Sequence, residues 1–281
     1  RQVEILILDE ADRMLDMGFI PDVRRIIGNM PNRTKRMTQM FSATLNSTIL
    51  TLGRSFLKDE HETIEIEPDT IVNAEVEQLT YAVMAKDKLA IILWYFQNQN
   101  VERMIIFCNR KDISSRISRD LYCYGVDNEV MNGDIPQKKR MSLLERFRSG
   151  ETKVLVATDV AGRGIHVDNV SHVVNYDLPF EPEEYVHRVG RTGRAGAKGT
   201  AISFACEHSA YELPAIEEYI GNELAYTDLQ PGMTELPEKV RKPKPGSEYK
   251  KKDDRRSGGG GGRSGGGPRK GGPRNNNRNR R

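Results

Sequence analysis

The sequence predicts an α/β fold in which parallel sheets carry helices on both faces. Short apolar runs that suit strands alternate with amphipathic stretches that suit helices, a pattern typical of strand–helix–strand units. Polar residues cluster directly after several of the apolar runs. A length of 281 residues suffices for one partial and one complete lobe of this kind. Because ligands bind at the carboxyl ends of strands in such sheets, those polar clusters are the candidate sites.

The first domain is expected to span residues 1–67. An apolar run at residues 3–8 predicts a strand, a helical stretch follows it, and residues 38–41 predict a second strand. Polar residues without periodicity then predict a linker at residues 68–76.

The second domain, expected at residues 77–224, continues the alternation. A parallel sheet covered by helices on both faces therefore follows for this domain as well. The expected strands are 79–84, 104–108, 127–131, 153–158, 172–176 and 200–205. The expected helices are 87–96, 113–121, 137–147, 183–189 and 210–220.

Residues 225–281 are expected to form a disordered basic tail rich in Gly and Arg. From Lys239 to Arg281 there are sixteen Lys and Arg against three acidic residues, although the whole chain has a net charge of only +3. Few apolar residues are available there to offset the entropy of ordering. The positive charge suits phosphate contacts that do not depend on base sequence, so RNA or DNA is an expected partner. A tail that only improves solubility is the alternative.

Membrane insertion and disulfide bonding are not indicated. No stretch reaches the ~18 uninterrupted apolar residues that a membrane span requires. Cys108, Cys123 and Cys206 lie far apart without the paired spacing of a disulfide framework or a zinc site. A reducing cytoplasm is the expected location. The chain opens with Arg1 directly before an apolar run, which leads us to expect an amino-terminal portion that precedes it.

Acidic residues follow the first predicted strand in the order Asp9, Glu10, Ala11 and Asp12. A Mg²⁺ ion that keeps several waters needs one or two carboxylates plus substrate phosphates, and Asp9 can supply one of them. Glu10 can orient and deprotonate an attacking water. The alternative is an ordinary helix start, where acidic residues are favoured.

A basic block with regular glycines follows the predicted helix at 183–189. Its residues His187, Arg188, Arg191 and Arg194 are interleaved with glycines, so a turn after the helix can direct guanidinium groups toward one point. Guanidinium groups match phosphate oxygens and stabilise the charge that develops as a γ-phosphoryl group leaves. A basic surface loop is the alternative.

Taken together, these motifs resemble the DEAD-box family of ATP-dependent RNA helicases, whose lobes are RecA-like. The segment LILDEADRMLDMGF resembles the family's motif for magnesium binding and hydrolysis, which implies these roles for Asp9 and Glu10. The segment FSATL is similar to the motif that links hydrolysis to RNA separation. The hydroxyls of Ser42 and Thr44 are expected to bond a carboxylate such as that of Asp12.

The second domain resembles the family in its basic block HRVGRTGRAG. The resemblance implies that Arg191 and Arg194 are arginine fingers directed at ATP. It assigns His187, Arg188 and Gln137 to the coupling of hydrolysis with RNA binding.

Further segments of the second domain, IIFCN, GDIPQKKR and ATDVAGRG, resemble the family's RNA-binding segments. Small residues there allow close approach of the backbone to phosphates, which suits binding without base readout. The RNA-binding residues that the resemblance implies are Asn109, Arg140, Thr158, Asp159, Arg163 and Gly164.

Within the family the chain looks most like the bacterial RhlB type, on the basis of His166, the segment YDLP at 176–179 and the basic tail. His166 departs from the Asp that the wider family uses to bond the ATP ribose. The resemblance implies an enzyme that unwinds short RNA duplexes when ATP closes two lobes, with ribonuclease E or another RNA-degrading assembly as partner. No G-x-x-x-x-G-K-[ST] phosphate loop is present, so this chain alone is expected to be inactive. The alternative is an RNA- or partner-binding module without ATPase activity.

Overall fold

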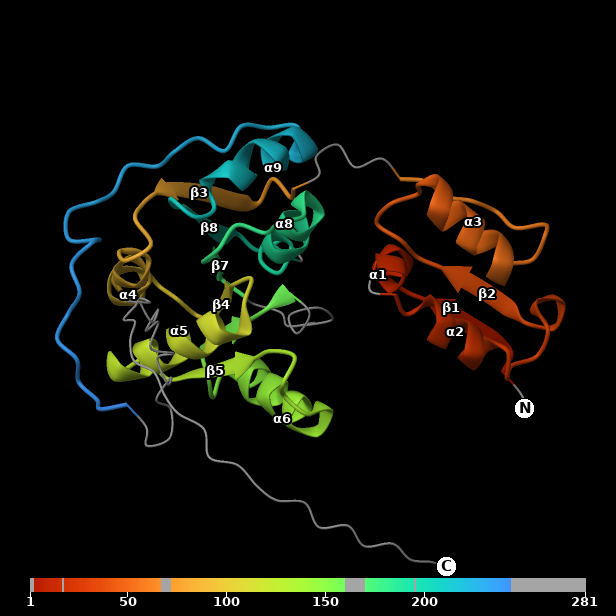
Figure 1. The fold of residues 1–281 in the computed structure, drawn as a ribbon, viewed down its shortest axis with the longest axis horizontal. Helices are drawn as coiled ribbons and strands as arrows, with labels where there is room; N and C mark the ends of the chain where they lie inside the picture. Colours follow the sequence, from red (N-terminus) through yellow and green to blue (C-terminus); the bar gives the residue numbers. More distant parts are fainter. Residues whose placement is uncertain (1–2, 17, 67–71, 160–169, 195, 244–281) are drawn as a thin grey trace, which may run out of the picture. The chain divides into compact units, whose positions relative to one another are not determined.

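A computed structural model of the chain describes residues 3–16, 18–66, 72–159, 170–194 and 196–243. Contacts divide the chain into two compact units, Arg1–Ile71 and Val72–Arg281. The division falls inside the predicted linker, and each unit is described by itself below. Helices and strands carry the labels of Figure 1.

Unit 1 is a small α/β layer built on two parallel strands. Strands β1 and β2 pair in parallel, with Ile5 opposite Met37 and Leu8 opposite Met40. The core on the helical side contains Leu8 and Phe56. Asn46 caps α3 by accepting hydrogen bonds from the backbone of its first turn. The elements are β1 (Ile5–Leu8), α1 (Ala11–Asp16), α2 (Ile20–Ile27), η1 (Arg33–Lys35), β2 (Met37–Met40) and α3 (Ser47–Phe56).

The other face of this two-stranded sheet exposes apolar side chains. Ile5, Ile7 and Met37 are each more than half exposed. Alternation along the strands and the pairing of Ile5 with Met37 place all three on the same face. Helices cover both faces of parallel sheets in most α/β proteins. Unit 1 therefore has the form of a partial lobe.

Unit 2 is a complete lobe with a six-stranded parallel sheet in the order β3-β8-β7-β4-β6-β5. The predicted α/β fold is confirmed. Its strands are β3 (Val76–Ala82), β4 (Met104–Phe107), β5 (Asn128–Met131), β6 (Val154–Ala157), β7 (His172–Asn175) and β8 (Gly199–Ala205). Its helices are α4 (Lys88–Asn98), α5 (Lys111–Cys123), α6 (Gln137–Arg148), α8 (Pro182–Val189), η2 (Ala210–Glu212) and α9 (Leu213–Ile220).

Helices bury both faces of this sheet, as Figure 1 shows. Alternate residues of β4 point to opposite faces, and all four are buried. Ile106 packs in one core cluster with residues of α4 and α5. Phe107 packs in another with residues of α6, while α8 and α9 cover the sheet near β3 and β8. This burial explains why the central strands β4 and β6 are continuous apolar runs.

The segment 225–243, which we name the strap, lies against unit 2, so the prediction of a disordered tail from residue 225 is wrong for this part. Met233 is 1% exposed and belongs to the core cluster of α4 and α5. The backbone N–H of Val240 donates to Cys123 O at 2.9 Å. Arg241 forms an ion pair with Asp127 at 2.6 Å. These few contacts hold the segment although its apolar content is low. The remainder of the predicted tail, 244–281, lies outside the described residues.

Among the residues that the structure describes, no helix has the length and apolar character that spanning a membrane would require.

Candidate functional site

The first group of candidate residues lies at the carboxyl end of β1. Asp9 is exposed, and its Oδ1 accepts a hydrogen bond from the Glu10 backbone N–H at 3.0 Å. Glu10 has φ of 53°, a left-handed conformation that is uncommon for residues other than glycine. Such conformations cluster at functional sites, where they aim a side chain. Asp9 Oδ2 has no hydrogen-bond partner among the described residues, so this oxygen is available for a hard cation such as Mg²⁺.

Asp12, in the first turn of α1, joins the end of β1 to the end of β2. Its Oδ2 accepts from the backbone N–H groups of Ala43 and Thr44 at 2.9 and 3.1 Å, and its Oδ1 accepts from Arg13 N at 2.8 Å. The predicted contact with Ser42-Ala43-Thr44 therefore exists, but backbone groups supply most of it. The Thr44 hydroxyl lies 3.5 Å from Asp12 Oδ2. The buried Ser42 hydroxyl has no partner within the described part of the chain, so the expected bond to Asp12 is wrong for this residue.

The arginine Arg188 of α8 is the centre of a polar network in unit 2. Its side chain is 1% exposed and binds both carboxylate oxygens of Asp159 in a fork, at 2.6 and 2.7 Å. It also donates to Asn109 Oδ1 at 2.8 Å, to Asp177 O at 2.6 Å and to Asn175 Oδ1 at 3.3 Å. Five donated bonds thus satisfy a buried guanidinium, which is the condition for keeping such a charge inside a protein.

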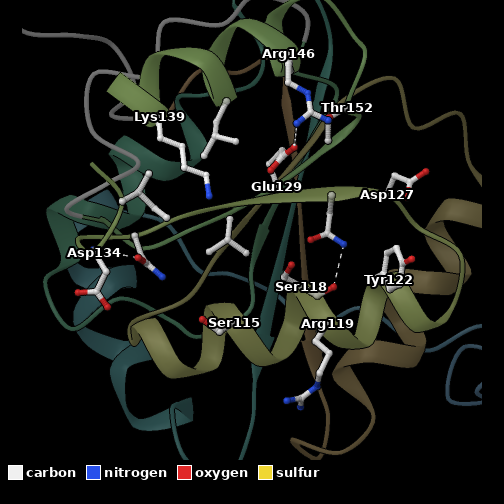
Figure 2. Close-up of a pocket in the computed structure, with 15 residues that line it drawn as sticks. Ser115, Ser118, Arg119, Tyr122, Asp127, Glu129, Asp134, Lys139, Arg146 and Thr152 are labelled. Carbon is white, nitrogen blue, oxygen red and sulfur yellow. Dashed lines mark hydrogen bonds and ion pairs between the residues drawn. The ribbon is translucent and has the colours of Figure 1, made fainter. Parts of the chain in front are cut away.

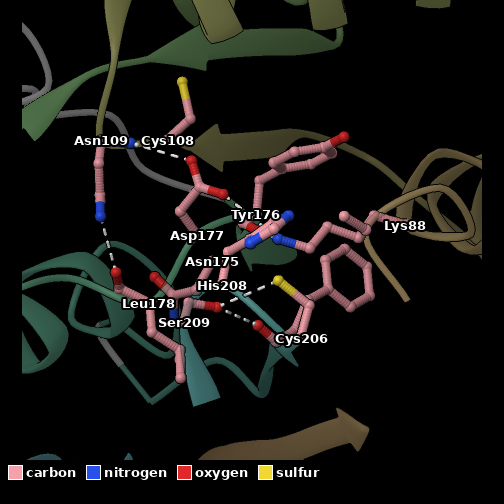
Figure 3. A network of polar contacts seen from close by, with 12 residues as sticks. Lys88, Cys108, Asn109, Asn175, Tyr176, Asp177, Leu178, Cys206, His208 and Ser209 are labelled. Carbon is pink, nitrogen blue, oxygen red and sulfur yellow. Dashed lines mark hydrogen bonds and ion pairs between the residues drawn. The ribbon is translucent and has the colours of Figure 1, made fainter. Parts of the chain in front are cut away.

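The topology explains why these groups meet. Strands β7, β4 and β6 are neighbours in the sheet, and the polar residues follow directly after each of them. Asn109 also donates from Nδ2 to Leu178 O at 2.9 Å, and its backbone N–H donates to Asp177 Oδ2 at 3.3 Å (Figure 3). The network therefore ties three strand ends together at the edge where ligands bind in such sheets. Burial raises the pKa of the adjacent Cys108 thiol to about 12, which leaves it un-ionised at neutral pH.

The residues predicted to bind RNA are only partly described. Asn109 and Asp159 lie in the network, where their side chains have protein partners, and Thr158 is buried beside them with its N–H donating to Met131 O at 3.1 Å. RNA contact by these three residues stays a prediction. Arg163, Gly164 and the departing His166 lie outside the described residues.

Gln137 and Arg140 lie on the first turn of α6. Gln137 is exposed, whereas Arg140 is half-buried. The Nε atom of Arg140 is buried and has no hydrogen-bond partner among the described groups. A buried donor without a partner carries a desolvation cost, which an anionic ligand would remove.

The two remaining arginines, Arg191 and Arg194, lie together after α8. Arg191 donates from Nε to His187 O at 3.1 Å, and Arg194 donates from Nε to Gly190 O at 2.8 Å. Both line a hollow of about 180 Å³. Gly193, with φ of +67°, permits the turn between them, and a Cβ there would collide with the Val76 side chain. The structure thus brings Arg191 and Arg194 together at one hollow.

A larger groove of about 700 Å³ lies between α5 and α6, along the edge strand β5 (Figure 2). Its charged residues are largely engaged with one another or with nearby residues, for example Arg146 with Glu129 at 2.5 Å. None of the predicted site residues lines this groove.

Sequence reasoning did not single out Asp177 and Asn175 as site residues. Both accept hydrogen bonds from Arg188. The signal that marks them is a polar pair around the end of the buried strand β7, in the segment NYDL.

Two helicase family models match the chain. The model described as "Helicase conserved C-terminal domain" matches residues 86–196, within unit 2. The model described as "DEAD/DEAH box helicase" matches residues 1–52, within unit 1. The fold and both matches thus place the chain in the DEAD/DEAH box helicase class.

Several curated relatives share one name. "ATP-dependent RNA helicase RhlB" of Pseudomonas syringae pv. tomato is 49% identical over 223 residues, which are 79% of this chain and 56% of that protein. The RhlB of Pseudomonas aeruginosa is 50% identical over 222 residues, again 79% of this chain and 56% of the relative. The chain therefore spans about half the length of the curated relatives that it matches.

Solved structures agree with this assignment. Saccharomyces cerevisiae Dbp5 bound to RNA and ADP BeF3 is 31% identical with a TM-score of 0.68, over 79% of this chain and 59% of that one. Escherichia coli DEAD-box protein SrmB bound to regulator of ribonuclease activity A is 31% identical with a TM-score of 0.53, over 60% of this chain and 100% of that one. The chain belongs to the DEAD-box family of RNA helicases. Within that family it is RhlB-like.

Proposed function

We propose that the protein containing this chain separates short RNA duplexes by ATP-driven closure of two RecA-like lobes. The observation that carries the proposal is the pair Asp9 and Glu10 at the end of β1. Asp9 Oδ2 has no hydrogen-bond partner in the described part of the chain, and Glu10 has a left-handed backbone conformation that clusters at functional sites when it occurs outside glycine. Carboxylates arranged in this way suit magnesium-dependent phosphoryl transfer to water.

Each motif then has a chemical role. Asp9 would hold Mg²⁺, through water, and the ion would neutralise negative charge on the phosphates of ATP. Glu10 would orient the attacking water and accept its proton. Arg191 and Arg194 would stabilise the charge that develops on the γ-phosphate. Asp12, bonded to the segment after β2, would transmit the state of the hydrolytic motif to that segment.

RNA would bind through its backbone at the carboxyl ends of the unit 2 strands. The Arg140 Nε atom, buried without a partner in the described structure, supports a contact to a phosphate oxygen. Coupling of hydrolysis to RNA binding would involve Gln137, His187 and Arg188. The RNA backbone would also contact Asn109, Thr158, Asp159 and residues 163–164. Basic residues of the tail would add contacts that do not depend on base sequence.

We further propose a place for this activity. The relatives are named RhlB, and the resemblance to that type suggests work with ribonuclease E in an RNA-degrading assembly of the cytoplasm.

A second candidate concerns this chain by itself. Its sequence contains no G-x-x-x-x-G-K-[ST] loop, whose backbone N–H groups cradle ATP phosphates in P-loop enzymes. The chain alone would then act as an RNA- or partner-binding module. Hydrolysis would require the part of the relatives that it does not span.

The test is the affinity of this chain for a single-stranded RNA and for the DNA of the same sequence, measured by fluorescence anisotropy at several salt concentrations. We expect tighter binding of RNA, because the 2′-hydroxyl distinguishes the two strands, and affinities that fall with salt. Arg140→Ala should weaken binding to RNA, whereas the charge-matched control Arg25→Ala on α2 should not. Equal affinities for RNA and DNA would contradict the proposed RNA specificity.

A further inference from the structure

Lys88, in the first turn of α4, is a buried cation that none of the assigned motifs contains. Its side chain is 2% exposed. Nζ donates to Tyr176 O at 2.5 Å and to Asp177 Oδ1 at 3.3 Å, and it lies 4.8 Å from the centre of the Tyr176 ring. An ammonium group at this depth is costly unless it is paired and hydrogen-bonded. The role of Lys88 can therefore be inferred from the groups that it binds.

The partners of Lys88 lead directly to the Arg188 network. Asp177, which binds Lys88 through Oδ1, accepts the backbone N–H of Asn109 at Oδ2, 3.3 Å away. The carbonyl oxygen of the same Asp177 accepts from Arg188 at 2.6 Å, and Asn109 Oδ1 accepts from Arg188 at 2.8 Å. Figure 3 shows Asp177 between Lys88 on one side and Asn109 on the other. Asp177 thus connects the buried lysine to Asn109 and to Arg188.

The charges of this assembly also balance. Lys88 and Arg188 supply two positive charges, and Asp159 and Asp177 supply two negative charges. Loss of the Lys88 charge would leave one carboxylate in excess, 22% exposed, at a strand edge that we propose to face the RNA phosphates. The excess charge would repel those phosphates, and Asp177 would lose one of the contacts that fix its side chain.

We infer that Lys88 is a positioning residue for RNA binding, which acts by holding Asp177 and through it Asn109 and Arg188. This inference rests on the proposed function, because it takes the carboxyl ends of β4, β6 and β7 as the RNA-facing edge. Lys88 itself does not touch RNA, since its Nζ is buried beneath Tyr176 and Asp177.

The experiment replaces Lys88 by methionine, which keeps most of the side-chain volume and removes the charge. We expect the affinity of the chain for single-stranded RNA to fall about tenfold, as for the loss of one well-placed charge-assisted hydrogen bond. The double variant Lys88→Met/Asp177→Asn removes the excess negative charge and should recover part of that loss. A structural role alone would make the double variant no better than the single one.

A second readout follows the network without RNA. The Nε–H group of Arg188 donates to Asp159 at 2.6 Å, so its proton should give a protected, downfield signal in ¹⁵N NMR spectra. We expect Lys88→Met to shift this signal and to speed its exchange with water. The control is Tyr95→Phe, which removes a buried hydrogen bond to Tyr81 in the same core cluster; among the described residues, the Tyr95 hydroxyl has no hydrogen bond to the Arg188 network. It should lower stability and leave both the signal and the RNA affinity unchanged.

The outcomes separate the two proposals. If Lys88→Met binds RNA as tightly as the wild type and keeps the Arg188 signal, the inference is overturned and Lys88 serves stability alone. If the wild-type chain does not bind RNA, the proposed function fails, while the Arg188 signal still decides whether Lys88 positions this residue. Should Lys88→Met not fold, the Arg188 signal in Asp177→Asn carries the test, because this variant removes the ion pair to Lys88; a signal that Asp177→Asn leaves unchanged would overturn the inference.

Discussion

Replacing Arg188 by alanine should destabilise unit 2 more than any loss of an exposed charge. The substitution removes five hydrogen bonds and leaves Asp159 and the Asp177 carbonyl without their cation. Removal of one partner of a buried ion pair costs about 3–5 kcal/mol. Because the Asp159 side chain keeps 22% exposure and can regain some water, we expect the lower end, about 3 kcal/mol. For a unit of this size that corresponds to a fall in melting temperature of roughly 6–12 °C.

Thermal unfolding followed by circular dichroism measures this effect. The matched control is Lys111→Ala, which removes an ion pair to Asp134 whose side chains are 65% and 66% exposed, and which should cost less than about 1 kcal/mol. In the double variant Arg188→Ala/Asp159→Asn the two losses should not add, because the carboxylate is no longer left unpaired. Equal melting temperatures for Arg188→Ala and Lys111→Ala would refute the reasoning.

Three further predictions concern unit 2. Burial lowers the pKa of His172, so below about pH 6.5 the unfolded chain binds a proton that the folded chain does not. The free energy of unfolding should therefore fall from pH 7 to pH 5. In urea titrations, His172→Asn should flatten that pH dependence. Gly199→Ala should cost about 1–3 kcal/mol, because the added Cβ would collide with the Thr192 hydroxyl, whereas Gly133→Ala meets no atom within 4 Å and should have a much smaller effect. Cys108, whose thiol has its pKa raised by burial to about 12, should react with a thiol reagent only when the chain unfolds, as a time course in urea would show.

The sheet of unit 2 could be predicted from sequence because strands that are buried on both faces are short runs of apolar residues. Strand β4 is a run of apolar residues, expected at 104–108 and found at Met104–Phe107. The helices between the strands carry apolar residues on one side, which gives the second periodicity. Both patterns lie within short stretches of sequence, so they could be recognised without knowing which elements pack together.

The partners of Asp12 could not be predicted in the same way. A sequence displays side chains, so the hydroxyls of Ser42 and Thr44 were the expected donors. The structure uses the backbone N–H groups of Ala43 and Thr44, which the pairing of Phe41 with Leu8 and Ala11 brings beside Asp12. Backbone donors are the same for every residue and leave no mark in composition.

Lys88 and the strap were hidden for a related reason. A lysine at the start of an amphipathic helix is normally solvated, and burial of Lys88 depends on a carbonyl and a carboxylate that lie 88 and 89 residues away. The strap contains few apolar residues, yet one of them, Met233, is inserted into the core. The average composition of a segment does not reveal that one residue, such as Met233, is buried in the core.

RNA-stimulated ATP hydrolysis, with Glu10→Gln as the variant, tests the central claim most directly. The measurement compares this chain alone with the same chain extended by the amino-terminal part of an RhlB relative. The account predicts no hydrolysis by the chain alone, RNA-stimulated hydrolysis by the extended form, and its loss in Glu10→Gln, because the water would then lack its base. Hydrolysis that Glu10→Gln leaves unchanged, or an extended form that binds RNA and does not hydrolyse ATP, would contradict it.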